Sequence, residues 1–526
     1  MGQRDKWQDF MPSEDSFFQP GDAKSIWRRY CGPLFLSLED FMEVQNHLLN
    51  ERLDLLAQSR PEKGSMTGLK LAGVDEFRRL LPLTKYKDYL SSLSSEQDNS
   101  GADDGQVWVQ TSAPGGTFKH VPWTYRFQRV QWRNVIGALI LSSARAQEEI
   151  AVAPGIRALI ILPPQPFASA CLASCLSEQF PAQILPPLDI GQKLPFRRRI
   201  DLGLQLALVH DLDYVISMTS SLLVTGERAS RMANRGGIPL SITKLNHRVL
   251  WRLLWRRFGF RRNLAPRHLW SVKGIVSWGA DTDIFKKRIE AQWGRPLYQL
   301  YASSESGIIA MQESLKGPLA FLPDSVFLEF LPEEEKEAGD DARTVLISEV
   351  EDGKLYEPVI TNFYGMPFLR YRQGDLVRIH RDDSGKVPRM SFYGRADDVI
   401  DLYGIARLNT QTVSRALELA GVTHGNWCLR KEYEGDKAIL MFYIEVAEGT
   451  QAAEIERLLH RGLKAADQHY REAVYTMAFN PTRVTALPQG TFQRLAASAG
   501  GSSRQMKMNP PDSLIQELMT LSRQTR

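Results

Sequence analysis

The segment Leu300-Tyr-Ala-Ser-Ser-Glu-Ser-Gly307 carries the most information about the fold. It follows a predicted helix over Phe285–Trp293, a Gly-Arg-Pro turn and a short apolar strand over Leu297–Leu300. An aromatic ring, several hydroxyls and a carboxylate therefore arrive where a strand is expected to end. Because ligands of open α/β sheets collect at the carboxyl ends of strands, this segment is a candidate binding site.

The chemistry of these side chains leaves two interpretations open. Ser303 and Ser304 can donate to a phosphate, and Glu305 can hold a Mg²⁺ ion on that phosphate. The alternative is a polar turn that caps a following helix, with Ser304 or Glu305 near the cap.

Outside this segment, short apolar runs alternate with helical patterns. Buried strands are predicted at Arg157–Leu162, Tyr214–Met218 and Gly274–Ser277, each flanked by helical periodicity. This alternation predicts an α/β domain with a largely parallel core sheet. Val326–Phe330 and Val345–Val350 are separated by a charged stretch and predict a hairpin or a loop excursion. The first hundred residues are predicted to be helical, with an apolar stripe of Phe41, Val44, Leu48, Leu49, Leu53 and Leu56.

The pattern changes after Gly394, which suggests a domain boundary. Strand-like Ala438–Ile444 is followed by an amphipathic helix over Ala452–Leu463. We therefore predict a large N-terminal domain over residues 1–394, with mixed or parallel sheets and helices. A smaller, mobile α+β domain is predicted over residues 395–526.

Composition excludes several classes of protein. The 526 residues are 43% hydrophobic and 24% charged, which is typical of folded domains rather than disordered or fibrous chains. A formal net charge of +4 does not indicate a nucleic-acid partner. Four cysteines in so long a chain form no disulfide framework. The N-terminus lacks the apolar core of a signal peptide and no apolar run is long enough to span a bilayer, so a cytoplasmic protein is expected.

Two segments downstream add candidate binding residues. Phe368-Leu-Arg-Tyr-Arg-Gln-Gly-Asp-Leu376 holds Asp375 behind a tight Gly turn, where a carboxylate can accept from both ribose hydroxyls. Taken alone, an ordinary turn Asp beside two solvated arginines is the simpler interpretation. Tyr393-Gly-Arg-Ala-Asp-Asp398 places Arg395 and two acids at the predicted boundary.

Together these segments resemble the adenylate-forming superfamily. The likeness is closest to the acyl-acid amido synthetases (the Gretchen Hagen family) and to the related bacterial phenylacetate–CoA ligase-like proteins. Tyr301-Ala-Ser-Ser-Glu305 resembles the family's aromatic-hydroxyl-Glu motif, and Phe327-Leu-Glu-Phe-Leu-Pro332 resembles the strand that follows it. Further resemblances lie at Pro82-Leu-Thr-Lys-Tyr-Lys-Asp88, at Gly490-Thr-Phe492 and at Gly501-Ser-Ser-Arg-Gln-Met-Lys507.

The resemblance implies a role for each matching residue. Tyr301 would stack on adenine, Ser304 would contact the α-phosphate and Glu305 would hold Mg²⁺. Asp375 and Arg395 would hold the ribose, and Lys507 would neutralise the carboxylate and phosphates during adenylation. The backbone of Gly279 and Ala280 would line the adenine pocket, Ser303 would join the nucleotide site, and Asp397 would mark the hinge of the small domain.

The phosphate loop departs from the family pattern. It reads Gln110-Thr-Ser-Ala-Pro-Gly-Gly-Thr-Phe-Lys119. The family's loop ends in Gly-Gly-x-x-Lys, and Gly115, Gly116 and Lys119 fit this ending. Thr111 and Ser112 supply hydroxyls that can bind phosphate. Ala113 and Pro114 stand where the family has Thr and Ser, which removes two hydroxyls and one backbone N–H that would bind phosphate.

The resemblance implies an ATP- and Mg²⁺-dependent ligase. It would form an acyl-adenylate from a small carboxylic acid and transfer the acyl group to an amine, with an amino acid as the expected acceptor. One alternative forms a thioester with coenzyme A or a carrier protein. Another is a nucleotide-binding protein with weakened catalysis, an interpretation motivated by Ala113-Pro114. No nucleic acid and no transmembrane segment are expected.

Two features lie outside the resemblance. The first is a basic and aromatic segment, Trp251-Arg-Leu-Leu-Trp-Arg-Arg-Phe-Gly-Phe-Arg-Arg262, with Arg197–Arg199 upstream. Such a segment can bind a membrane surface, a nucleic acid or a carrier domain. We favour the simpler interpretation, an amphipathic helix whose arginines are solvated. Cys171 and Cys175 are four residues apart on a predicted helix and are interpreted as buried thiols rather than metal ligands.

Overall fold

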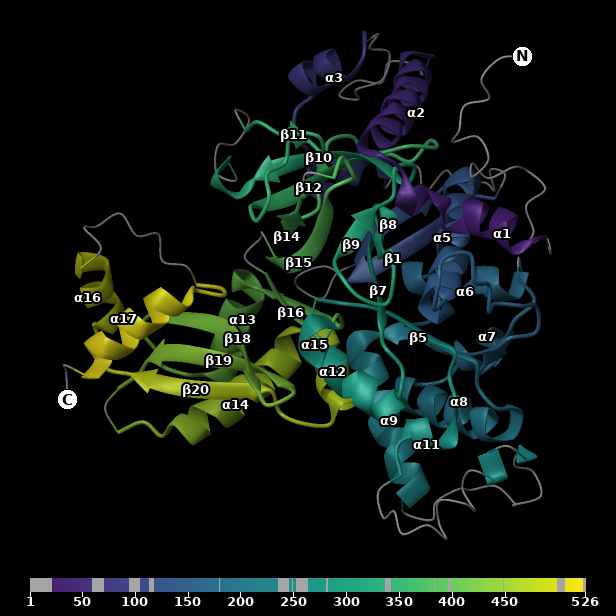
Figure 1. Ribbon diagram of the computed structural model, residues 1–526. Helices are drawn as coiled ribbons and strands as arrows, with labels where there is room; N and C mark the ends of the chain where they lie inside the picture. The colour runs from purple at the N-terminus through teal and green to yellow at the C-terminus, as the bar shows by residue number, and fades with distance from the viewer. Residues whose placement is uncertain are drawn as a thin grey trace. The chain divides into compact units, whose positions relative to one another are not determined.

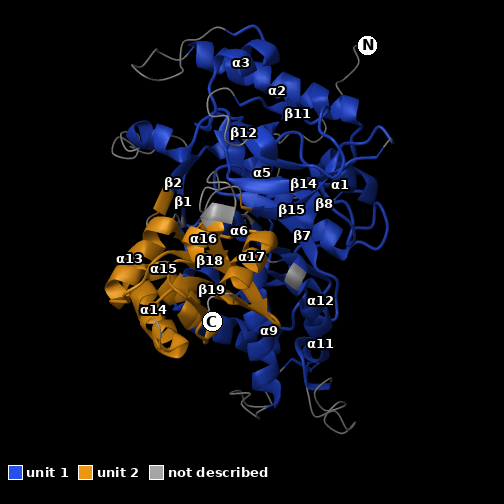
Figure 2. Cartoon of the chain, turned by 90° about the vertical axis from the view of Figure 1, so that its left-hand side faces the viewer, with its two compact units in different colours: residues 1–111, 120–394 blue, residues 112–119, 395–526 orange. Residues whose placement is uncertain are grey.

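The computed structural model describes most of the chain (Figure 1). The described residues are 21–58, 71–93, 105–112, 118–178, 180–234, 246–247, 249–251, 264–280, 282–335, 342–382, 384–395, 399–447, 449–498 and 507–523. Two compact units, shown in Figure 2, consist of residues 1–111 with 120–394 (unit 1) and of residues 112–119 with 395–526 (unit 2).

Unit 1 is built on one long mixed sheet. Its strands follow the order β11-β10-β12-β14-β15-β9-β8-β7-β6-β5-β3-β4, and β13 pairs with β12. The bounds are β3 Arg157–Ile161, β4 Gln183–Leu185, β5 Tyr214–Met218, β6 Gly274–Trp278, β7 Tyr298–Ser303, β8 Gly307–Gln312, β9 Leu319–Phe321, β10 Val326–Pro332, β11 Val345–Leu346, β12 Leu355–Asn362, β13 Tyr371–Arg372, β14 Asp375–His380 and β15 Arg389–Arg395. A separate pair is formed by β1 Val107–Ser112 and β2 Phe118–Trp123.

The sheet changes character at β7. Strands β4, β3, β5, β6 and β7 run parallel to their neighbours. From β7 onward the described pairings are antiparallel. The predicted parallel core is therefore confirmed for these strands, but the sheet as a whole is mixed. Of the hairpin or loop excursion predicted between Val326–Phe330 and Val345–Val350, the antiparallel pair β10–β11 bears out the hairpin, although β11 ends at Leu346 and not at Val350.

Helices cover both faces of the parallel half. Because successive strand residues point to opposite faces, Ala158 and Ile160 join the core that includes α5, whereas Leu159 and Ile161 face Gly203 of α8. The helices of unit 1 are α1 Ala23–Tyr30, α2 Leu38–Gln58, α3 Val74–Leu80, α5 Tyr125–Ser143, α6 Ala168–Glu178, α7 Leu188–Gly191, α8 Phe196–His210, α9 Thr219–Asn234, α11 Pro266–Leu269 and α12 Thr282–Trp293. Short 3₁₀ turns lie at Gly32–Phe35, Tyr86–Tyr89 and Glu333–Glu335.

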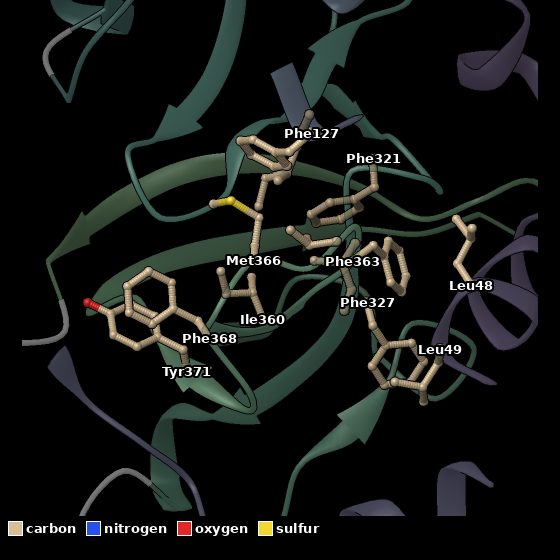
Figure 3. Close-up of a cluster of buried hydrophobic side chains, with 14 of the residues drawn as sticks. Leu48, Leu49, Phe127, Phe321, Phe327, Ile360, Phe363, Met366, Phe368 and Tyr371 are labelled. Carbon is tan, nitrogen blue, oxygen red and sulfur yellow. The ribbon is translucent and has the colours of Figure 1, made fainter. Parts of the chain in front are cut away.

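The antiparallel half encloses a second, aromatic-rich core (Figure 3). The predicted apolar stripe of α2 is confirmed, since Phe41, Leu48 and Leu49 are buried in this core. The same core contains Phe327, Phe363 and Phe368 from the sheet and its loops. The core thus holds the loop that precedes β13 against the sheet.

Unit 2 has its own sheet and its own core. The antiparallel pair β18 Trp427–Glu434 and β19 Lys437–Glu445 continues into β20 Thr482–Leu487, which is parallel to β19. The other elements are β16 Val399–Leu402, β17 Ala406–Asn409, α13 Thr410–Ala420, α14 Ala452–Ala466, α15 Gln468–Met477, α16 Thr491–Ser498 and α17 Asp512–Arg523. Strand Ala438–Ile444 and helix Ala452–Leu463 are thus found where they were predicted.

The Gly490-Thr-Phe492 motif has a structural role in unit 2. The buried Glu445 carboxylate accepts from the backbone N–H of Phe492 at 2.8 Å and from that of Asn426 at 3.0 Å. The Phe492 ring packs with Leu518 of α17. The motif therefore fixes the start of α16 on the core of unit 2.

None of the helices in the described ranges combines the length and apolar composition required to span a bilayer. Cys31, Cys171 and Cys428 are buried and form no disulfide, whereas the side chain of Cys175 lies outside the described part of the chain.

A buried ion pair joins α5 to the strand connection before β10. Arg133 donates to both carboxylate oxygens of Asp324, one of them at 2.9 Å, and their side chains are 5% and 0% exposed. We expect Asp324→Asn to lower the free energy of unfolding by about 3–5 kcal/mol, because it leaves a buried guanidinium without a counter-charge. The exposed pair Lys354–Glu351 supplies the control, and Glu351→Gln is expected to cost less than about 1 kcal/mol in urea unfolding. Equal costs for the two variants would contradict this account.

His460 makes unit 2 sensitive to acid. Its Nδ1 lies 2.9 Å from the Tyr470 hydroxyl, and burial, with Lys464 nearby, lowers the pKa of His460 to about 4. The unfolded chain binds this proton below its ordinary pKa of about 6.5, so stability is lost as the pH falls from about 6.5 towards 4. We expect His460→Gln to show a shallower loss than the wild type in urea unfolding at pH 7, 6 and 5. His424→Gln is the control, and an identical slope in all three proteins would refute the assignment.

Candidate active site

Tyr301 connects two motifs that are far apart in the sequence. Its hydroxyl donates to Asp375 Oδ2 at 2.7 Å and to Gln373 Oε1 at 2.9 Å. Tyr301 lies on β7, and Asp375 begins β14 directly after Gly374, whose φ of +75° closes the preceding turn. The aromatic motif and the Gly-Asp motif are therefore joined by charge-assisted hydrogen bonding.

A second bond joins the same two motifs in the opposite direction. The Tyr371 hydroxyl, on β13, donates to Glu305 Oε1 at 2.8 Å. Tyr371 is 1% exposed and Glu305 is 7% exposed. The two predicted acidic residues, Glu305 and Asp375, each accept from a tyrosine of the other motif.

The segment at residues 300–307 has a different local structure from the one predicted. Strand β7 continues through Ser303, so Tyr301 and Ser303 lie on the strand rather than beyond its end. Its register with β8 shifts between Tyr301 and Ala302, which is a β-bulge or irregularity. The alternative of a helix cap is wrong, because the next element is the antiparallel strand β8. The polar residues therefore form a hairpin turn at the strand where the sheet changes from parallel to antiparallel.

Neighbouring elements fix the backbone of this turn. Trp123 Nε1 donates to the Ser304 carbonyl at 2.8 Å, and Asn362 Nδ2 donates to the Glu305 carbonyl at 2.9 Å. Gly307 has a φ of +63°, and a Cβ there would lie 2.3 Å from the Gln131 side chain. These contacts leave little freedom in the position of the turn.

The two turn serines differ in their bonding. The Ser303 Oγ accepts from the Ser306 N–H at 3.1 Å and bonds to Ser306 Oγ at 2.8 Å. Among the residues that the structure describes, none donates to or accepts from the Ser304 hydroxyl, although the residue as a whole is only 8% exposed. The geometry suits Ser304 for a ligand better than Ser303.

The arginines at 370 and 372 are not solvated, contrary to the simpler interpretation of their segment. Arg370 is buried and donates to both oxygens of Glu329, at 3.1 and 2.9 Å. Arg372 donates to Glu357 at 2.7 Å, and the other oxygen of Glu357 accepts from the Gly374 N–H at 3.0 Å. The 368–375 loop is therefore anchored by an ion pair on each side of Tyr371.

The Pro82–Asp88 segment, which carried a resemblance without an assigned role, anchors the same loop. Thr84 forms a parallel bridge with Tyr371, through Thr84 N to Arg370 O and Arg372 N to Thr84 O, both at 2.9 Å. Tyr86 accepts from the His120 N–H at 2.7 Å and donates to the His120 carbonyl. Burial raises the pKa of Tyr86, and the Glu305 carboxylate adds to this rise.

The Gly279-Ala280 turn follows β6 on the parallel side of the sheet. Thr282 Oγ1 donates to the Gly279 carbonyl at 2.6 Å, and Thr219 Oγ1 bonds to Ser277 at 3.0 Å and to Thr282 at 2.8 Å. Gly279 has a φ of +145°. Buried hydroxyls thus define the course of the turn that is expected to line the adenine pocket.

Only the flanks of the predicted phosphate loop belong to the described chain. Thr111 and Ser112 end β1, Lys119 lies on β2, and the loop residues 113–117, with Gly115 and Gly116, lie outside the described residues. The Phe118 ring contacts the His469 ring of α15 within unit 2, with centroids 5.0 Å apart.

Lys507 lies at the edge of the unit 2 sheet. Leu429 N donates to the Lys507 carbonyl at 2.8 Å, and Met508 bridges Leu429 in parallel, so this segment extends the sheet beyond β18. The Lys507 ammonium lies 5.0 Å from the centroid of the Trp427 ring. Arg395 ends β15, and the predicted hinge residue Asp397 lies outside the described residues.

Sequence reasoning missed Tyr371 and Gln373, although both lie in a segment that it singled out. Their hydrogen-bonding groups lie close to Asp375 in the sequence, but only the folded structure shows that Tyr371 donates to Glu305 and that Gln373 accepts from Tyr301. Most of the Trp251–Arg262 segment lies outside the described residues. Arg199 is buried and donates to the carbonyls of Leu194 and Gly191, so it is a structural residue rather than part of a basic surface.

The donor set suits a magnesium ion held largely by a substrate. No cluster of three or more Asp, Glu, His or Cys side chains that could hold a metal occurs within the described ranges. Mg²⁺ on a nucleotide needs only one or two carboxylates besides phosphate oxygens and water, and the carboxylate of Glu305 is the candidate for one of them.

Comparisons with known proteins agree with this architecture. Residues 319–395 match the GH3 family central domain, and residues 410–510 match the GH3 family C-terminal domain. Jasmonoyl–L-amino acid synthetase GH3.5 of Oryza sativa subsp. japonica is 27% identical over 236 residues, or 38% of each chain. Indole-3-acetic acid-amido synthetase GH3.8 of Oryza sativa subsp. indica is 26% identical over 232 residues, which is 40% of this chain and 38% of the relative. The matches thus span less than half the length of these relatives.

The likeness in fold covers most of the chain. The solved structure of AtGH3.15 acyl acid amido synthetase in complex with 2,4-DB superposes with a TM-score of 0.54 at 16% identity, covering 96% of this chain and 97% of that one. The predicted fold class and the resemblance to the Gretchen Hagen family are confirmed. Residues 319–395 and 410–510 therefore match two domains of the GH3 family, and the fold resembles that of an acyl acid amido synthetase.

Proposed function

We propose that this chain is an ATP-dependent ligase that activates a small carboxylic acid as an acyl-adenylate and transfers the acyl group to an amine, an amino acid in particular. The observation that carries the proposal is a pair of hydrogen bonds, each from a tyrosine hydroxyl to a carboxylate. Tyr301 with Asp375 and Tyr371 with Glu305 join the two motifs expected to bind ribose and metal-bound phosphate. The GH3 family domains that cover residues 319–395 and 410–510 support the same assignment.

In the first half-reaction, a carboxylate oxygen attacks the α-phosphorus of ATP, the bond from that phosphorus to the bridging oxygen breaks, and pyrophosphate leaves. Both reactants are anionic, so the protein contributes mainly positioning and positive charge. In our proposal Tyr301 stacks on adenine, Asp375 and Arg395 hold the ribose, and Ser304 donates to the α-phosphate. Gly279, Ala280 and the flanks of the phosphate loop line the nucleotide. When bound through Glu305, Mg²⁺ supplies further neutralisation of the phosphates.

In the second half-reaction, the amine nitrogen attacks the acyl carbon, AMP leaves with the bonding electrons and the nitrogen loses its proton. We propose that residues 1–394 bind the nucleotide and the acid. Residues 395–526, which carry Lys507, would act as the mobile domain that turns about Asp397 between the two steps. The amine as acceptor is supported by the relatives named jasmonoyl–L-amino acid synthetase and indole-3-acetic acid-amido synthetase.

The first test is ATP–pyrophosphate exchange over a panel of carboxylic acids that includes jasmonate, indole-3-acetate and benzoates. We expect exchange with at least one acid. Subsequent addition of amino acids, coenzyme A or a carrier protein, with the products identified by mass spectrometry, separates an amide from a thioester. A folded protein that binds ATP without exchange would instead support the alternative of a nucleotide-binding protein, which the Ala113-Pro114 substitution motivates.

Lys507→Ala tests the proposed electrostatic role of unit 2. We expect the rate of adenylation to fall about a hundredfold, as it does when one positioned donor is removed from a site of developing charge, with little change in ATP affinity. The matched control is Lys437→Ala, because the Lys437 ammonium also lies over an aromatic ring, 5.3 Å from the Phe479 centroid. Single-turnover rates that are equal in the two variants would exclude Lys507 from catalysis.

A further inference from the structure

Tyr371 is a buried polar residue that the proposed reaction leaves without a role. Its hydroxyl donates to Glu305 Oε1 at 2.8 Å, across 66 residues of sequence. Figure 3 shows its hydroxyl at the outer edge of the aromatic core, next to the ring of Phe368. The bond therefore leads out of the core towards the hairpin turn that carries Glu305.

The ring of Tyr371 is held from several sides. Its centroid lies 4.6 Å from that of Phe368 and 6.5 Å from that of Tyr89. The Tyr89 hydroxyl accepts from the Leu369 N–H at 2.8 Å, and Thr84 bridges both peptide units that flank Tyr371. Neither the ring nor its backbone can shift without breaking these contacts, so the hydroxyl presents a fixed donor.

A fixed donor determines how the Glu305 carboxylate is oriented. The backbone of Glu305 is already held through Asn362, so the side-chain torsions are the remaining freedom. A hydrogen bond to Oε1 selects one orientation of the carboxylate plane. Hydrogen-bonded neighbours of metal-binding carboxylates typically change metal affinity by about 10–100-fold.

We propose that Tyr371 is a positioning residue that orients Glu305 for the divalent cation that accompanies ATP. This inference rests on the proposed function, because it takes Glu305 as the metal-binding carboxylate. In this proposal the segment Thr84–Tyr89 holds Tyr371 in place, through the backbone of Thr84 and the ring of Tyr89. The cation site is thus built from four segments: 84–89, 304–306, 362 and 368–375.

The test is calorimetric binding of ATP at a series of Mg²⁺ concentrations, which does not require turnover. We expect Tyr371→Phe to raise the half-saturating Mg²⁺ concentration about tenfold, while ATP affinity without Mg²⁺ changes little. The control is Tyr443→Phe, since the Tyr443 hydroxyl donates to Glu432 at the same distance, 2.8 Å, in unit 2. This control is expected to keep the wild-type Mg²⁺ dependence.

A double-mutant cycle separates positioning from a general structural effect. If Tyr371 acts through Glu305, then Tyr371→Phe produces no further change in Mg²⁺ dependence once Glu305→Gln is present. Additive effects would overturn the inference, as would an unchanged half-saturation in Tyr371→Phe. Should that variant fail to fold, Tyr89→Phe, which loosens the brace but keeps the ring, is expected to shift the same parameter less, and no shift would overturn the inference.

Exchange assays on the same proteins keep this inference distinct from the proposed function. A wild-type protein that binds ATP with Mg²⁺ but shows no exchange rejects the ligase, yet the shift in Tyr371→Phe still supports the positioning role. A wild-type protein with exchange and no shift in the variant retains the ligase and rejects the positioning role. A wild-type protein that does not bind ATP rejects both.

Discussion

The buried pair between Arg370 and Glu329 holds the loop on which the candidate site depends. The pair is bidentate, and both side chains are almost fully buried, so its strength depends on every remaining N–H having an acceptor. Arg370 meets this condition because its other three N–H groups donate to Thr344 and to the carbonyls of Arg78 and Leu81. Because the φ of Arg370 is +45°, the chain turns sharply there and sends Tyr371 towards Glu305. This anchoring keeps Tyr371 in contact with Glu305 while Asp375, four residues later, accepts from Tyr301.

Strand β7 supplies the other half of the site. It is parallel to β6 on one side and antiparallel to β8 on the other, so it belongs to both halves of the sheet. The helix-covered parallel half brings the Gly279 turn, and the antiparallel half brings Asp375 and Tyr371. Tyr301 thus lies on the strand at which the two halves of the sheet meet. The position of the aromatic motif on this strand explains why one short segment was so informative.

Local pattern was a good guide to the elements and a poor guide to their partners. The strands at 157–161, 214–218 and 274–278 and the helix α2 were predictable, because burial imposes a period on the sequence. Of the two interpretations of residues 303–305, the helix cap is wrong, since Ser, Glu and Gly suit a cap and a hairpin turn equally well. The arginines at 370 and 372 were judged solvated, because nothing near them in the sequence reveals the glutamates at 329 and 357 that bind them.

The sequence by itself determined the order of the motifs and the chemical type of each candidate residue, since these depend only on composition and spacing. It also determined the strand and helix periodicity that places the parallel core. Only the tertiary structure decided that Tyr301 contacts Asp375 and that Tyr371 contacts Glu305. The physical reason is that each bond joins residues 66 or 74 positions apart and depends on rings and ion pairs buried between them. Such contacts follow from the packing of the whole sheet, which no local stretch of sequence encodes.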